Sequence, residues 1–150
     1  MKLENLKKSE LISMLKEVAS YNDVTSIHSF KDAVDQLVLS VTNWKQEQFI
    51  CIYLNGANNV ISTKIIFKGT LNSSIVHPRE VFAPAYELRA ASIIIAHNHP
   101  SGNLHPSKED IAVTKRLLEV SKILGIDVLD HIIFRADSKC YSFKKECNLI

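Results

Sequence analysis

The residues with the clearest capacity for chemistry follow an apolar run at 91–96. His97 and His99 stand two residues apart at the end of that run. Ser107 comes next, and Asp110 lies three residues after the serine. The apolar run is typical of a buried strand, and the serine and the aspartate open a helical pattern. We therefore expect a strand, a polar loop and a helix start, an arrangement in which rigid elements hold functional side chains.

The spacing of the histidines favours a metal site. On an extended strand, residues i and i+2 point to the same side with Cα atoms roughly 6.5 Å apart, so both imidazoles can reach one ion. Asp110 projects from the first helical turn, which the loop between Pro100 and Pro106 can fold back over the histidines. Two histidines and one carboxylate leave a fourth tetrahedral position open, as in catalytic zinc sites, where bound water has a pKa of about 7.

Each of these residues also has an ordinary structural explanation. Asp110 alone fits a carboxylate stabilised by the helix dipole, and Ser107 alone fits a helix N-cap. A His-x-His pair alone is weak evidence for a metal. The combination is stronger because spacing, secondary structure and chemistry agree, but the residues by themselves leave metal binding and a purely structural role both open.

Hydrophobic periodicity predicts four helices around this stretch. We interpret the first as packing on the same domain, with a partner-binding helix as the alternative. Ser29 with Asp32 resembles a capping box at the start of the second. Pro84 should kink the third helix or delay its start, and Gly125 is a natural stop for the fourth. The four predicted helices span residues 2–20, 29 to about 44, 77 to about 88, and 107 to about 124.

Apolar, β-rich segments predict five strands, two pairs of which are joined by turns as hairpins. Strands and helices together predict an α/β or α+β layer, with a mixed central sheet flanked by helices. An exposed strand edge in such a sheet could support pairing between chains, so an oligomer is possible. The predicted strands lie at 47–54, 60–68, 91–96, 127–134 and 140–143.

Composition narrows the function classes. With 150 residues the chain fits one domain, and a net charge of +2 gives no electrostatic case for nucleic acid. The three cysteines form no Cys-x-x-Cys pair, so neither a disulfide framework nor a cysteine zinc site is indicated, and Cys51 is predicted to be core. No signal segment and no run long enough for a membrane span are visible. We expect a cytoplasmic protein without membrane association.

The motif His97-x-His99-x7-Ser107-x2-Asp110 resembles that of the JAMM (MPN+) metalloproteases. Further segments, over roughly residues 28–145, are similar to the RadC family. The resemblance implies a cytidine-deaminase-like JAB/MPN fold with a single zinc ion. It also implies a RadC-like domain over 29–150, preceded by a helical extension over 1–28. The similar segments are Gly69–Asn72, Val76–Glu80, Ala96–Gly102 and Leu129–Ile133.

The resemblance also implies roles for individual residues. His97, His99 and Asp110 would be the zinc ligands, and Ser107 would help to hold the oxyanion or the water. The family also uses an upstream glutamate as general base, a position that Glu47 matches. The rival for that role is Glu80, whose alternative role is stabilisation of a helix N-terminus. The alternative role of Glu47 is a solvated charge at a strand end.

Two other histidines are interpreted differently from the predicted ligands. His105 stands where a small or polar residue is expected in the family's loop. It is interpreted as a solvated loop residue, with a second-shell donor or an occasional fourth ligand as alternatives. His131 is interpreted as a buried structural histidine or a residue of the site wall, and not as a ligand.

Two functions remain from the sequence. The first is a zinc-dependent hydrolase that cleaves an amide or isopeptide bond of a peptide substrate with activated water. The second is a non-catalytic accessory module, linked to DNA repair or mobile elements, that binds DNA or a DNA-associated protein. Longer RadC proteins carry an N-terminal helix-hairpin-helix region that binds DNA. Residues 1–28 are too short for that region, which predicts a short form and weakens the DNA-repair interpretation.

Overall fold

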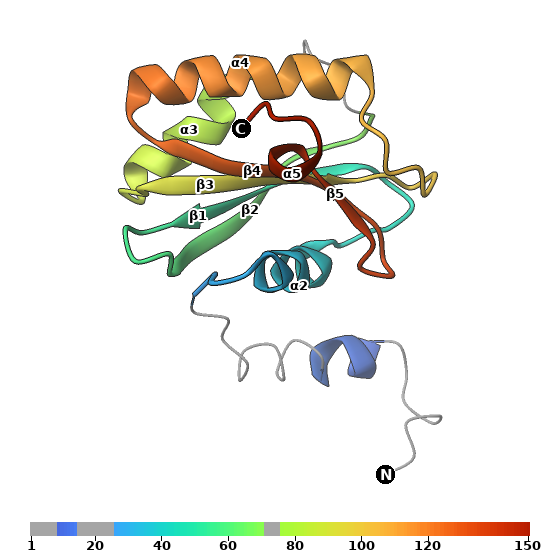
Figure 1. Cartoon of the computed structure of the whole chain (residues 1–150). Helices are drawn as coiled ribbons and strands as arrows, with labels where there is room; N and C mark the ends of the chain where they lie inside the picture. The colour runs from blue at the N-terminus through green and yellow to red at the C-terminus, as the bar shows by residue number, and fades with distance from the viewer. Residues whose placement is uncertain (1–8, 15–25, 71–75) are drawn as a thin grey trace.

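A five-stranded mixed sheet forms the centre of the fold (Figure 1). The computed structural model describes residues 9–14, 26–70 and 76–150. The strand order is β2-β1-β3-β4-β5; β3 and β4 run parallel, and the other neighbouring pairs are antiparallel. This architecture confirms the predicted mixed sheet. The strands are β1 (Gln48–Leu54), β2 (Val60–Lys68), β3 (Ser92–Asn98), β4 (Asp127–Phe134) and β5 (Cys140–Ser142).

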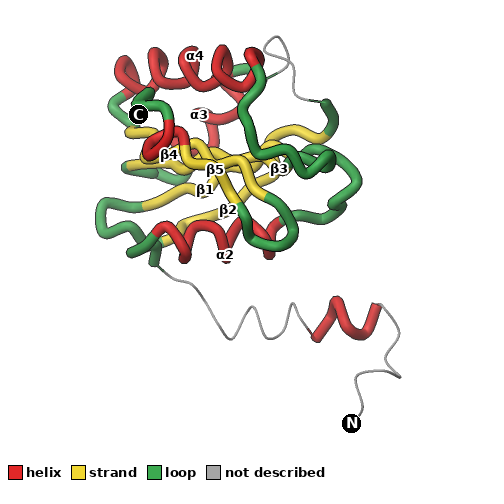
Figure 2. The backbone as a smooth tube through the Cα atoms, turned by 45° about the vertical axis from the view of Figure 1, so that its right-hand side comes forward, coloured by secondary structure: helices red, strands yellow, loops and turns green. Residues whose placement is uncertain are grey.

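Helices cover both faces of the sheet (Figure 1 and Figure 2). On one face lie α3 (Pro78–Glu87) and α4 (Lys108–Leu124), and on the other lies α2 (Phe30–Ser40). A short helix, α5 (Phe143–Glu146), follows β5. Within the part of the chain that the structure describes, no helix combines the length and apolar character that a membrane crossing requires.

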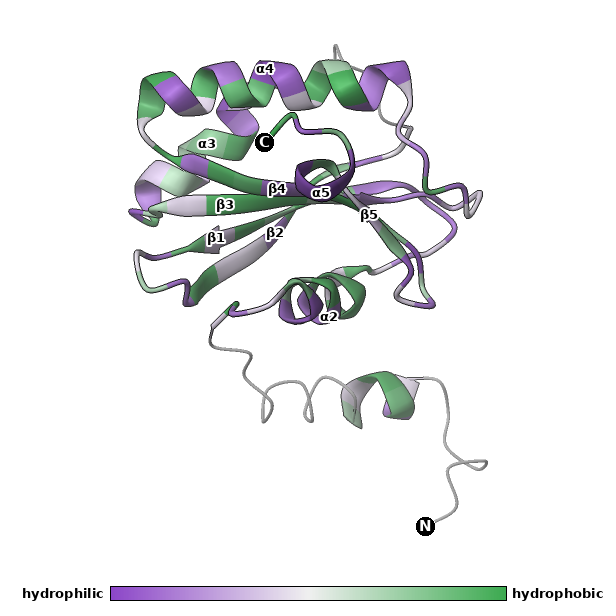
Figure 3. Cartoon of the chain, viewed as in Figure 1, coloured by the Kyte–Doolittle hydropathy of each residue, from purple (hydrophilic) through white to green (hydrophobic). Residues whose placement is uncertain are grey.

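The inner strands are buried on both faces because helices lie above and below them. Phe49 and Cys51 of β1 pack in the cluster beneath α3 and α4, whereas Ile50 and Ile52 pack in the cluster against α2. Figure 3 shows hydrophobic colour along most of β3, which has the same double burial. Coverage on both faces explains why these strands read as continuous apolar runs and not as alternating patterns. Cys51 is core, as predicted, and burial raises the pKa of its thiol to about 12.

Both predicted helix starts with Ser at the N-cap are confirmed. Ser29 and Asp32 form a complete capping box at α2. The predicted end of α2 near residue 44 is wrong, because the helix stops at Ser40 and Val41 is extended. The buried side chain of Gln48 bonds both the backbone N–H and the hydroxyl of Thr42, which draws the chain away from the helical path.

Pro84 lies inside α3 without delaying its start, so of the two predicted effects the delay does not occur. A proline removes one backbone donor, here the one that would bond the carbonyl of Glu80. Glu80 lies on the exposed side of the helix, where water can satisfy its carbonyl. The helix therefore continues through Pro84 to Glu87.

Two other boundaries differ from the predictions. β3 continues two residues beyond the predicted end, so His97 is paired within the sheet, with Phe49 on one side. β5 ends at Ser142, whose hydroxyl caps α5, so Phe143 begins a helix that the pattern did not predict. Of the helix predicted over 2–20, residues 9–14 are helical and the remainder lies outside the described residues.

The packing of α2 on the sheet yields a matched stability test. Leu37 is 0% exposed and Leu39, two residues on in the same helix, is 57% exposed. We expect Leu37→Ala to lower the free energy of unfolding by about 2–5 kcal/mol, because it leaves a cavity in the core. Leu39→Ala should change it by no more than about 0.5 kcal/mol. Urea unfolding measures both, and equal effects would contradict the assigned face of α2.

Candidate metal centre

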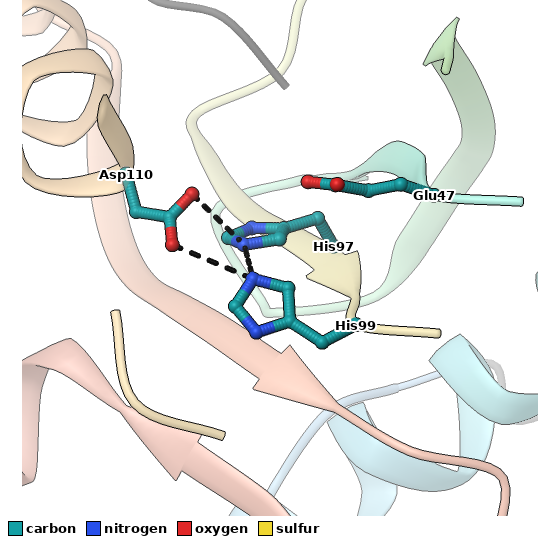
Figure 4. Close-up of side chains that lie close together, drawn as sticks. All are labelled: Glu47, His97, His99 and Asp110. Carbon is teal, nitrogen blue, oxygen red and sulfur yellow. Dashed lines mark hydrogen bonds and ion pairs between the residues drawn. The ribbon is translucent and has the colours of Figure 1, made fainter. Parts of the chain in front are cut away.

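Four side chains from three parts of the chain converge at one end of the sheet (Figure 4). His97 is the second-last residue of β3, His99 follows the strand, and Asp110 lies in the first turn of α4. Glu47 immediately precedes β1, which pairs antiparallel with β3, so its start lies beside the end of β3. One ligand atom from each of these residues lies within 4.8 Å of all the others.

The two imidazoles and the Asp110 carboxylate face one another closely. His97 Nε2 is 2.9 Å from His99 Nε2 and 3.2 Å from Asp110 Oδ1. His99 Nε2 is 3.4 Å from Asp110 Oδ2. The side chains of His97 and Asp110 are 0% and 2% exposed, and that of His99 is 14% exposed. Two imidazole nitrogens and a carboxylate are a donor set that suits zinc and similar transition metals, so these residues fit a metal ion.

The loop that follows β3 orients His99. Its Nδ1 bonds the backbone carbonyl oxygen of Asn103. A carbonyl oxygen only accepts, so Nδ1 must carry the hydrogen. In the neutral ring the lone pair is therefore on Nε2, the atom that faces Asp110. Such a bond from the distal ring nitrogen is the usual support of a metal-bound histidine.

A second histidine, His131, supports His97 from the neighbouring strand β4. His97 Nδ1 is 2.8 Å from His131 Nε2, and His131 Nδ1 is 2.6 Å from the hydroxyl oxygen of Thr114 in α4. His131 is 0% exposed and lies outside the four-residue group, which agrees with its predicted buried, non-ligand role. Its contact with His97 was not predictable from the sequence, because the register of β3 against β4 is not visible there.

Asn98, between the two histidines, holds the segment that carries Glu47. Its side-chain oxygen accepts from the backbone N–H of Gln48 at 2.8 Å, and its amide donates to the carbonyl of Gln46 at 3.0 Å. Asn98 thus bonds the residues on both sides of Glu47, and it is itself 1% exposed. Sequence reasoning missed this residue, although a buried polar residue in an apolar strand end is a signal that could have pointed to it.

The capping box at the start of α4 includes a residue of the candidate metal centre, Asp110. Ser107 Oγ accepts from the backbone N–H of Asp110 at 3.0 Å, and Asp110 Oδ2 accepts from the backbone N–H of Ser107 at 2.7 Å. The same carboxylate faces both histidines, so its capping role and its position at the candidate metal centre occur together. The structural explanation for these two residues is therefore confirmed without excluding the ligand role.

Burial and hydrogen bonding shift the pKa values of side chains at and beside this centre. Burial acts to raise the pKa of Asp110, but bonds to His97 and His99 outweigh it and hold that pKa far below its usual range. Burial acts to lower the pKa of His99, but the bonds to Asp110 and Asn103 leave it raised. Burial holds the pKa of His131 well below its usual value. The site therefore carries an ionised carboxylate beside imidazoles, which suits a cation.

A cavity of about 1050 Å³ opens beside the centre. Glu47, His99, Ser107 and Asp110 line it. Its other walls come mainly from the segment before β1, the loop after β3 and the two residues that follow β2. The cavity brings the predicted base, the predicted oxyanion residue and two predicted ligands to one surface.

The other two residues considered from the sequence, His105 and Glu80, lie outside the four-residue group. His105 lines the cavity but is exposed and outside the four-residue group, which fits the solvated loop interpretation. Glu80 is exposed on α3, where its carboxylate pairs with Arg79. Glu80 neither joins the four-residue group nor lines the cavity, so the geometry favours Glu47 for any role at this centre.

Comparison with known proteins agrees with this geometry. A family model described as a RadC-like JAB domain matches residues 27–149. The chain belongs to the RadC family. Similar relatives include UPF0758 proteins of Bacillus cereus, Bacillus anthracis and Bacillus thuringiensis, each 52% identical over 126 residues, which is 84% of this chain and 56% of the relative. The chain thus spans about half the length of these curated relatives. The family agrees with the predicted RadC resemblance and JAB/MPN fold.

The role of Asn98 leads to a stability prediction. Asn98→Ala removes both bonds to the segment around Glu47 and leaves the backbone N–H of the buried Gln48 without that partner. We expect the free energy of unfolding to fall by about 1–3 kcal/mol. Asn43→Ala, at an exposed position of the preceding loop, is the control and should cost less. Chemical denaturation measures both, and an unaltered Asn98→Ala protein would show that this amide does not hold the segment.

Proposed function

We propose that the chain is a zinc-dependent hydrolase that cleaves an amide or isopeptide bond in a peptide substrate. The observation that carries the proposal is the convergence of two imidazole nitrogens and two carboxylates at the wall of an open cavity. A structural zinc site is usually closed by four protein ligands, often cysteines. The described free cysteines lie outside this group.

The donor set supports zinc over the hard cations. Calcium and magnesium prefer all-oxygen ligands, whereas imidazole suits zinc and neighbouring metals. His97, His99 and Asp110 would hold the ion. When bound, zinc polarises a carbonyl group and brings the pKa of water to about 7.

The position of Glu47 supports a role in proton transfer. Its carboxylate belongs to the group within 4.8 Å and also lines the cavity, so it is close both to the ligands and to the space for a substrate. A carboxylate in that position can take a proton from the attacking water and deliver it to the leaving amine. Asn98 supports this role because it bonds the backbone on either side of Glu47.

Ser107 can bind a substrate oxygen while it caps α4. Its Oγ accepts the backbone N–H of Asp110, which uses a lone pair and leaves the hydroxyl hydrogen for another acceptor. The residue is exposed and lines the cavity. A hydrogen bond from this hydroxyl would stabilise the oxyanion of the tetrahedral intermediate.

Metal content tests the first half of the proposal. We expect the purified protein, supplied with zinc, to hold about one zinc ion per chain, as the three-ligand donor set predicts. His97→Ala should lose most of that zinc, while His105→Ala, which alters an exposed histidine of the same cavity, should keep it. Elemental analysis after gel filtration measures the ratio. A native protein that stays zinc-free after supplementation would overturn the proposal.

Cleavage tests the second half. A mixture of linear and isopeptide-linked peptides, followed by mass spectrometry, would report the bond that is cut. Glu47→Gln should retain zinc and lose activity by about 10²- to 10⁴-fold, the usual contribution of a general base. Glu80→Gln should leave the rate unchanged.

Full activity of Glu47→Gln would remove Glu47 from the mechanism. A zinc-loaded protein that cuts none of these peptides but binds DNA, with an affinity that falls steeply as salt rises, would favour the accessory-module function instead.

A further inference from the structure

A chain of hydrogen bonds leads from α4 to the ligand His97. The hydroxyl oxygen of Thr114 is 2.7 Å from the carbonyl oxygen of Asp110 and 2.6 Å from His131 Nδ1. His131 Nε2 is in turn 2.8 Å from His97 Nδ1. Thr114, His131 and His97 are all 0% exposed, so water cannot replace any of these partners.

The hydrogens in this chain can be placed by counting donors and acceptors. The carbonyl oxygen of Asp110 only accepts, so the single hydroxyl hydrogen of Thr114 points to it. Thr114 must then accept at its oxygen, and the donor is the N–H at His131 Nδ1. One end of the chain is therefore set by a backbone carbonyl that cannot change its role.

The surroundings of His131 determine which atom donates in the next hydrogen bond, between His131 and His97. Its ring stacks on Phe143, with centroids 4.6 Å apart, and makes a T-shaped contact with Phe49, with centroids 5.8 Å apart. An apolar enclosure of this kind disfavours a charged ring, so His131 has one N–H, at Nδ1, and a lone pair at Nε2. His97 Nδ1 must then donate to it, which leaves the lone pair of the neutral His97 ring on Nε2.

The tautomer of His97 affects the candidate metal centre. His99 is held in the same tautomer by the carbonyl of Asn103. When both rings are neutral, two lone pairs therefore face each other across the 2.9 Å between His97 Nε2 and His99 Nε2, beside the oxygens of Asp110. Acceptors brought together in this way repel one another unless a cation lies among them.

We propose that Thr114 and His131 are positioning residues that fix the tautomer of His97, so that its Nε2 is presented to the metal without a hydrogen. The proposal rests on the proposed zinc site, and it adds two residues that neither touch the ion nor line the cavity. Asp110 contributes in two ways. Its side chain faces His97 and His99, and its backbone carbonyl accepts the first hydrogen bond of the series that leads to His97.

The test compares variants at Thr114. Thr114→Val keeps the shape of the side chain but removes the hydroxyl that accepts from His131. Thr114→Ser restores that hydroxyl. Ser121→Ala is the control, because Ser121 is a buried residue of the same helix whose hydroxyl bonds only the carbonyl of Leu118 among the contacts described. Thr114→Ala serves as a second variant without the hydroxyl if the valine protein does not fold.

Two measurements are made on each protein. Zinc affinity, from competition with a chromophoric chelator, should fall about tenfold or more in Thr114→Val, as expected for loss of support behind a ligand. Thr114→Ser and Ser121→Ala should stay near the native value. Long-range ¹H–¹⁵N spectra of metal-free protein, taken where the imidazoles are neutral, should show the Nδ1–H form of His97 and His131 in the native protein and in Thr114→Ser. Thr114→Val should shift both toward the Nε2–H form.

These outcomes separate the proposal from the proposed function. Native affinity and native spectra in the folded Thr114→Val or Thr114→Ala protein would overturn the positioning role, even if zinc binds as proposed. An Nε2–H form of His97 in the native protein would overturn it as well. Failure of the native protein to bind zinc would overturn the proposed function, while the spectra would still decide whether the hydrogen-bond chain sets the tautomer.

Discussion

The antiparallel pairing of β1 with β3 is the constraint on which the rest of this site depends. It places His97 opposite Phe49 in the interior of a sheet that is covered on both faces. A histidine at 0% exposure cannot obtain partners from water, so the neighbouring elements must supply them. β4 supplies one through His131, and the first turn of α4 supplies the other through Asp110. The same pairing brings the residue before β1, Glu47, to the end of β3.

The loop from β3 to α4 holds these parts together at the open side. The side chain of Arg135, after β4, donates to the carbonyl of Gly102 at 3.1 Å. Gly102 has φ +80°, a left-handed conformation that other residues rarely adopt, and it lies close to the Arg135 side chain. The middle of the loop is thus tied, through Gly102, to the residue that follows β4. A single turn of helix then combines an N-cap, a carboxylate at the candidate centre and the start of the hydrogen-bond chain to His97.

Periodicity and local chemistry were enough to predict the strands, the capping box at Ser29 and the convergence of the His-x-His pair with Asp110, because these depend on neighbours in sequence. The partners of His97 were not predictable, since His131 reaches it only through the register of two parallel strands. Asn98 was missed for a related reason: its partners lie about fifty residues earlier in the chain. The sequence left open whether Pro84 would delay α3 or lie within it, because the cost of the carbonyl left free by a proline depends on whether that side of the helix is exposed.

The proposed centre binds one zinc ion through two imidazoles and a carboxylate, without sulfur. X-ray absorption at the zinc edge of the loaded protein tests it most directly. The proposed centre should give a first shell of nitrogen and oxygen at about 2.0–2.1 Å, with the outer-shell scattering of two imidazole rings. A sulfur contribution at about 2.3 Å, or scattering from fewer than two imidazoles, would contradict it.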